Sequence, residues 1–304
     1  MTRLISAALL AAALAGTGRA WAGAGAEPFD FLSLDANARA VAMGGAYSAL
    51  ARDANALLYN PGGLGRIERH EATFMHNQAY QGVSQEYAAL AVRQGWGAHI
   101  NYLSFGGVPR TTVSNPDGAG LGDTGLTDLA FSGGYGRVVV PGLAVGGALK
   151  YIRESIDKVS AAGYALDLGA LYSVERAKGL SLAASVQNIG PAVKFQNAKE
   201  NLPLTIRAGA AYEATIREQR CAAAIDIIKE RSETVAVAFG AELVAARRFP
   251  IRFGYAGRND AGIGLTAGFG YRHDDFSVDY AFVPYGGLGD AHRISLSVRW
   301  GGFR

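Results

Sequence analysis

Cysteine, long apolar runs and clusters of basic residues are scarce or absent in this sequence. Cys221 is the only cysteine in 304 residues, so an internal disulfide is excluded. After residue 22, no segment reaches the roughly 18 consecutive apolar residues of a membrane-spanning helix. Charged residues make up only 18% of the chain and form no basic block, so nucleic acid is not an expected partner.

Residues 1–22 have the pattern of a secretory signal peptide. Arg3 supplies the positive charge, a short apolar stretch follows it, and residues 20–22 (Ala-Trp-Ala) form a small-x-small cleavage motif. We predict cleavage before Gly23, with a second candidate motif at residues 24–26. The apolar stretch is too short for a membrane anchor, which needs roughly 20 residues. The sequence therefore predicts an exported protein.

From about residue 69 onward, large apolar residues alternate with small or polar ones. The last such stretch places a large apolar residue at every second position: Ile294, Leu296, Val298 and Trp300. A period of two is that of a β-strand, and a transmembrane barrel requires it because lipid contacts one face and water the other. Soluble β-sandwiches and propellers also alternate, but their strands are usually shorter and their turns contain more proline.

Turn signals divide the alternating region into about 14 strands. We expect them at residues 69–79, 84–93, 97–105, 125–138, 142–154, 161–175, 179–188, 203–215, 219–229, 234–246, 249–257, 262–273, 275–284 and 291–301. The sequence therefore predicts an all-β fold, a transmembrane antiparallel β-barrel over residues 67–304. Such barrels cross the outer membrane of bacteria, so outer-membrane lipid is an expected partner.

Residues 23–66 lack this alternation and are expected to form a hatch that plugs the barrel. About 14 strands make a barrel too wide for its own side chains to fill. Residues 46–60 predict a short helix, since Leu50, Ala54 and Leu57 lie at helical spacing. Pro61 and the two glycines after it should end that helix. The alternative is a helix that lies outside the barrel, in the periplasm.

Residues that could perform catalysis or bind a metal do not cluster in the sequence. His70 and His76 are about 20 Å apart along an extended strand, too far to bind one metal. Asp117 and Asp123, in a glycine-rich loop over residues 108–124, lack the acidic spacing of a calcium loop. We therefore expect a protein that is not an enzyme, with no metal and no cofactor.

Five charged residues fall at polar-face positions of the expected strands, where they would point into the barrel: Asp128, Lys150, Asp167, Arg207 and Asp226. One interpretation is that they are solvated in the lumen or form ion pairs between strands. The functional interpretation is that they anchor the hatch or contact a ligand.

Two blocks near the N-terminus carry a family resemblance: the run from Asp35 to Tyr47, and the run from Asp53 to Leu64. Together they resemble the N-terminal signature of the PorV/PorQ family, which is related to FadL-like long-chain fatty-acid transporters. Residues 279–296 are similar to the closing hairpin of that family, and the middle of the chain resembles it only in pattern. The resemblance implies a 14-stranded barrel with an N-terminal hatch, whose motif residues here are Asp53, Asn55, Asn60, Pro61, Gly62 and Gly63.

The resemblance implies two functions that the sequence barely separates. Some PorV relatives hold or shuttle cargo at the outer membrane for type IX secretion, so exported proteins or secretion components are expected partners. The glycine-rich loop is long enough to reach them. The alternative is FadL-like transport of hydrophobic small molecules through an opening in the barrel wall. Transport predicts a hydrophobic ligand and an apolar pocket between hatch and wall.

Overall fold

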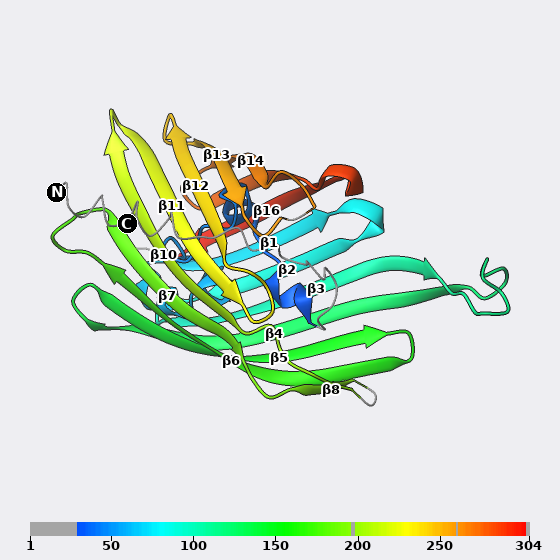
Figure 1. Ribbon diagram of the computed structural model, residues 1–304. Helices are drawn as coiled ribbons and strands as arrows, with labels where there is room; N and C mark the ends of the chain where they lie inside the picture. Colours follow the sequence, from blue (N-terminus) through cyan, green and yellow to red (C-terminus); the bar gives the residue numbers. More distant parts are fainter. Residues whose placement is uncertain (1–28, 196–197, 260, 302–304) are drawn as a thin grey trace.

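The structure is a computed structural model that describes residues 29–195, 198–259 and 261–301. The expected signal peptide and residues 23–28 lie outside these described residues. Within them, 14 antiparallel strands close into one barrel (Figure 1). In chain order, these strands are β1 (His70–Gln78), β2 (Ser84–Ala91), β3 (Trp96–Pro109), β4 (Asp123–Val140), β5 (Leu143–Ile156), β6 (Val159–Ser173), β7 (Leu180–Ile189), β10 (Thr205–Ile216), β11 (Gln219–Glu230), β12 (Ala236–Ala245), β13 (Phe249–Ala256), β14 (Leu265–Arg272), β15 (Phe276–Pro284) and β16 (Asp290–Trp300).

The barrel strands pair in chain order, and pairing of β1 with β16 closes the ring. Between β7 and β10, the short strands β8 (Val193–Phe195) and β9 (Ala198–Glu200) pair only with each other. The predicted all-β fold and strand number are confirmed. The glycine-rich loop is slightly shorter than predicted, because β3 continues to Pro109 and β4 begins at Asp123.

The two faces of the barrel wall differ in the polarity and size of their side chains. In β16, Ile294, Leu296 and Val298 are 53%, 47% and 43% exposed. The intervening residues are buried and polar: Arg293, Ser295 and Ser297. Large apolar groups therefore face outward and polar groups inward, the reverse of a soluble protein and the arrangement that a lipid environment requires.

The two ends of the barrel differ in the length of their longest connections. At one end, β4 and β5 are joined by two residues, as are β10 and β11, and paired His70 and Trp300 start and finish the barrel there. We call this the short-turn end. At the opposite, long-loop end, the β3–β4 hairpin reaches far beyond the other strands (Figure 1). In transmembrane barrels, short turns face the periplasm and longer loops face outward from the cell.

The N-terminal segment, residues 29–67, lies inside the ring of strands (Figure 1). Its helical turns are η1 (Asp30–Ser33), α2 (Ala38–Ala42), α3 (Ala56–Tyr59) and η2 (Pro61–Arg66). Helix α2 contacts β13 to β16, and η2 contacts β4 to β6 on the other side. No helix among the described residues is long and apolar enough to cross a membrane.

The single helix predicted over residues 46–60 is wrong, because only Ala56–Tyr59 are helical and the residues before them form turns. The backbone N–H groups of Tyr47 and Ser48 donate to the Asp226 carboxylate on the wall instead of to helical carbonyls. Pro61 does hold Asn60 in an extended conformation (φ −163°, ψ 102°), as predicted. The two glycines after Pro61 continue in η2 rather than turning the chain away.

Candidate functional site

The N-terminal segment contacts the inner wall in two chemically different ways. On one side, charged and polar groups of residues 35–48 bind side chains of β10 to β16. On the other side, residues 60–65 pack against glycines of β4 to β6. We call these the ion-pair contact and the glycine contact.

Asp226 and Arg207 form the first part of the ion-pair contact. Asp226 Oδ2 accepts from the backbone N–H of Tyr47 (3.3 Å) and Ser48 (3.1 Å), and its Oδ1 accepts from Ser48 Oγ at 2.7 Å. Arg207 Nη1 donates to Gly45 O at 3.0 Å and pairs with Asp226 at 3.3 Å. Both of these predicted lumen residues therefore form hydrogen bonds with the segment.

A second group of charges in the ion-pair contact was not identified from the sequence. Arg39, on α2, donates from Nε (3.0 Å) and Nη2 (2.9 Å) to the two oxygens of Glu242 on β12. Arg252 on β13, fully buried, donates to the same carboxylate at 2.6 Å and to Asp279 on β15 at 2.7 Å. Buried charges are tolerated when they are paired and hydrogen-bonded in this way. The sequence did contain an indication of these wall residues, because Glu242, Arg252 and Asp279 fall at polar-face positions of the alternating strands.

Asp35 makes a third link between the segment and the wall. Arg258, in the β13–β14 connection, donates to Asp35 at 2.9 Å, to Ser33 O at 2.6 Å and to Glu230 at 2.8 Å. Burial alone raises the pKa of Asp35, but the nearby guanidinium of Arg258 and other arginines outweigh it and lower the pKa. Asp35 therefore stays ionised and paired.

Asp53 and Asn55 of the predicted hatch motif act within the segment rather than on the wall. The Tyr47 hydroxyl donates to Asp53 and accepts from Arg39 at 2.9 Å. Burial raises the pKa of Tyr47 well above its usual value, so this hydroxyl keeps its proton. Asn55 donates to Asp53 from its backbone N–H at 3.0 Å and from its side chain at 3.2 Å.

Asn60 is the polar centre of the glycine contact. Its Nδ2 donates to Ala170 O on β6 at 2.9 Å and to Ser48 O at 3.3 Å, while its Oδ1 accepts from Gly62 N–H at 3.0 Å. The side chain therefore joins the wall, the preceding turn and the start of η2. Asn60 is fully buried, so these bonds satisfy amide groups that water cannot reach.

Glycines on both partners allow backbone-to-backbone packing at this contact. A Cβ added to Gly62 would lie 3.0 Å from Ala170 Cα. From the wall side, a Cβ on Gly146 would lie 2.2 Å from Pro61 O, and one on Gly169 would lie 2.1 Å from Asn60 Oδ1. Gly63 has a different role, since its Cβ would meet Ala51 O within the segment at 1.7 Å. Close approach thus explains the glycines of the predicted hatch motif, whereas Asp53, Asn55 and Asn60 form hydrogen bonds.

The remaining predicted lumen residues do not hold the segment. Lys150 Nζ pairs with Asp167 at 2.9 Å and donates to Asn188 at 2.6 Å, across a β6–β7 register shift. These residues form an ion pair and a hydrogen bond between neighbouring strands of the wall. Asp128 lies opposite Glu154 in the β4–β5 register, and it is Glu154 that accepts from Phe29 N–H at 2.8 Å.

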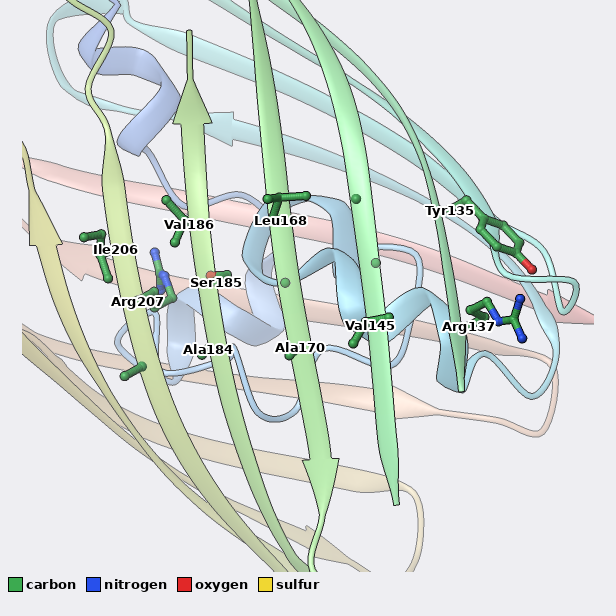
Figure 2. A pocket seen from close by; sticks show the side chains of 14 residues that line it. Tyr135, Arg137, Val145, Leu168, Ala170, Ala184, Ser185, Val186, Ile206 and Arg207 are labelled. Atoms are coloured by element: carbon green, nitrogen blue, oxygen red, sulfur yellow. The ribbon is translucent and has the colours of Figure 1, made fainter. Parts of the chain in front are cut away.

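An apolar pocket of about 690 Å³ lies on the outer face of the wall, directly outside the glycine contact. Figure 2 shows its lining residues on successive strands, with Tyr135 and Arg137 at one side and Ile206 at the other. Transport predicted an apolar pocket between hatch and wall. At the glycine contact that prediction is wrong, because segment and wall touch there and the cavity is outside.

An apolar cluster fills the lumen closer to the long-loop end. Phe29 and Phe31 of the segment pack there against Leu103, Ile152 and Leu202, and all five side chains are buried. Among the described residues, no group of three or more histidine, cysteine, aspartate or glutamate side chains could hold a metal ion.

Comparisons with known proteins bear on the fold. No protein-family profile and no curated protein sequence matches this chain. Among solved structures, the toluene transporter TodX of Pseudomonas putida aligns with a TM-score of 0.57 and 13% identity, over 88% of this chain and 98% of that chain. A FadL homologue of Pseudomonas aeruginosa aligns with a TM-score of 0.53 and 13% identity, over 84% of this chain and 95% of that chain. This level of likeness shows a FadL-like barrel fold, and it gives no support to the PorV/PorQ resemblance.

Proposed function

We propose that this protein is an outer-membrane barrel that passes small hydrophobic molecules, with residues 23–66 as its hatch. The carrying observation is that the described part of this segment occupies the lumen and binds the wall on two sides. A lumen filled in this way disfavours a general aqueous pore and favours a gated path. The FadL-like fold, shared with a protein described as a toluene transporter, supports the same function.

Location in the outer membrane, after export by the signal peptide, is part of this proposal. Large apolar side chains cover the outer wall, and Leu149, Tyr164 and Phe253 are among the most exposed. Rings close to the ends, such as the Trp96–Tyr135 pair with centroids 4.7 Å apart, suit the boundary between lipid and headgroups. Outer-membrane lipid would therefore surround the barrel.

The apolar cluster near the long-loop end is the proposed site where a hydrophobic ligand first binds. Ligand sites are mostly apolar with a few polar groups, and here Phe29 and Phe31 occupy such a place inside the lumen. A ligand that displaces these two side chains would keep the apolar environment intact. It would also loosen the segment at its first described residues.

A deletion strain with measured uptake of radiolabelled toluene and of a long-chain fatty acid tests this function. We expect apolar uptake to fall several-fold without the protein, while uptake of a small sugar stays unchanged. Phe31→Ala should lower apolar uptake, whereas Phe131→Ala, at an outward-facing phenylalanine, should not. Unchanged uptake of both apolar compounds in the deletion strain would refute the proposal.

Docking of exported proteins remains a second candidate, and one feature favours it. The β3–β4 hairpin projects beyond the barrel, and Val113 near its tip is fully exposed (Figure 1). Recovery of exported proteins or secretion components with the gently purified barrel, lost on removal of this tip, would support docking.

A further inference from the structure

The outer wall pocket is a furrow with a floor of small residues. Its floor follows one register row across adjacent strands: Val145 pairs with Ala170, Ala170 with Ala184, and Ala184 with Ala208. Elsewhere, the outward rows include rings and large aliphatic side chains, such as the Leu243–Ile251–Phe269 row. Three successive alanines therefore leave a hollow between rows of larger side chains.

The furrow has raised sides. On one side runs the next outward row, which contains Leu168, Val186 and Ile206. On the other side runs the row that contains Tyr172 and Leu182. Leu168 and Ile206 are 47% and 50% exposed, so they stand above the alanine floor. The cross-section is that of a channel open to the surrounding lipid.

A cation lies at one end of the furrow. Arg137 is the outward residue of β4 that pairs with Val145, so it continues the floor row. It is exposed, and its guanidinium forms no hydrogen bond or ion pair with any residue that the structure describes. An outward arginine costs about 2–4 kcal/mol at the bilayer midplane but little at the interface. Tyr135 and Trp96 beside it suit the interfacial level.

The furrow climbs from that interface toward the middle of the membrane. Arg137 lies three residues before the short-turn end of β4, whereas Ala208 lies eight residues before the short-turn end of β10. Strands of transmembrane barrels tilt by about 35–45°, so a row that runs across them also rises through the membrane. Five strands at a spacing of about 4.8 Å give the furrow a length of roughly 19 Å. One leaflet of a hydrocarbon core about 30 Å thick contains acyl chains of about 15 Å.

We propose that this furrow binds one phospholipid of the membrane leaflet at the short-turn end. The phosphate binds the Arg137 guanidinium, whose fork geometry matches phosphate oxygens. One acyl chain lies on Ala170, Ala184 and Ala208, between the raised side rows. Charge complementarity at one end and apolar complementarity along the rest select an acidic lipid over a neutral hydrocarbon.

Native mass spectrometry of the full-length barrel in mild detergent, with added phosphatidylglycerol, tests this site. We expect the wild type to retain about one lipid. Arg137→Gln should bind it about tenfold more weakly. Ala184→Phe fills the floor with another apolar group, so it should also weaken binding while keeping the outer face suited to lipid.

Two matched control substitutions distinguish specific binding in the furrow from nonspecific lipid binding to the barrel. Arg153→Gln removes an exposed arginine near the long-loop end of β5, and Ala223→Phe enlarges an exposed alanine on β11, outside the furrow. Both should retain lipid like the wild type. The proposal is overturned if Arg137→Gln or Ala184→Phe retains as much lipid as these controls, or if added toluene displaces phosphatidylglycerol. The assay requires no transport, so it stays readable if the transport function fails.

Discussion

The two contacts of the proposed hatch hold the same segment by opposite means. At the ion-pair contact, Arg39, Asp35 and Ser48 reach charged partners on β10 to β13 and in the β13–β14 connection. At the glycine contact, Pro61 and Gly62 approach the wall because no side chain keeps them apart. The ion-pair contact therefore depends on charged side chains, and the glycine contact depends on the absence of side chains.

This difference indicates which of the two contacts with the wall should break first. Breaking the ion-pair contact leaves buried charges without partners, which is costly. Separation at the glycine contact mainly exposes backbone and breaks the hydrogen bond from Asn60 to Ala170 O on the wall. We therefore expect the hatch to move away from β5 and β6 while it stays tethered to β10–β13.

The largest expected effect is at Glu242. Glu242→Leu removes the carboxylate that Arg39 and Arg252 share and leaves both guanidiniums without it. Removal of one partner from a buried ion pair costs about 3–5 kcal/mol. Urea unfolding of the barrel in lipid vesicles should show this loss. In planar bilayers, the conductance should rise because the hatch loses its tether.

A surface pair provides the control for Glu242. Glu218 pairs with Arg247 at 3.3 Å, and both side chains are more than 70% exposed. Glu218→Leu should change neither conductance nor unfolding measurably, since exposed pairs contribute little. Equal effects of the two substitutions would contradict the idea that burial makes the ion-pair contact strong.

The next largest effect is expected at Gly169. Gly169→Ala would place a Cβ 2.1 Å from Asn60 Oδ1 and 2.9 Å from Pro61 Cδ. Overpacking of this kind costs about 1–3 kcal/mol, and here the hatch can relieve it by moving inward. For each kcal/mol of unfolding free energy lost, Gly169→Ala should therefore raise the conductance more than Glu242→Leu does.

Gly133 on β4 is the matched glycine. An added Cβ there has no atom within 4 Å, so Gly133→Ala should leave the conductance unchanged. If Gly169→Ala behaves like Gly133→Ala, the close approach at the glycine contact has no mechanical role.

The barrel was predictable from the sequence, and the hatch contacts were predictable only in part. Alternation is a local signal, so it located the strands and placed Arg207 and Asp226 on the inner face. The partner of Arg39 is 203 residues away, and no local pattern reports such a pairing. The helix over residues 46–60 was mispredicted for a related reason. Asp226, a wall residue distant in the sequence, accepts hydrogen bonds from the backbone N–H groups of Tyr47 and Ser48, which a helix would use internally.

A smaller effect is expected at Asn60. Asn60→Ala removes the bonds to Ala170 O and Ser48 O and leaves buried carbonyls unsatisfied, a cost of about 1–3 kcal/mol. Asn55→Ala removes only a side-chain bond to Asp53 within the segment. Unfolding should therefore show a larger loss for Asn60→Ala, and only that substitution should raise conductance. The reverse order would mean that the hatch is held chiefly by its own turns.

The smallest effect is expected from deletion of residues 111–121 at the tip of the β3–β4 hairpin. This tip has its own bridge between Thr112 and Asn115, and it lies far from both hatch contacts. The Arg110–Asp157 pair, which joins the hairpin base to the β5–β6 turn at 2.5 Å, remains in the deletion. We therefore expect stability within about 0.5 kcal/mol of the wild type, the range of neutral surface changes, with toluene uptake unaltered. Loss of uptake would place a gating element outside the hatch. Loss of bound exported proteins, with uptake intact, would instead make the hairpin a docking element on a transport barrel.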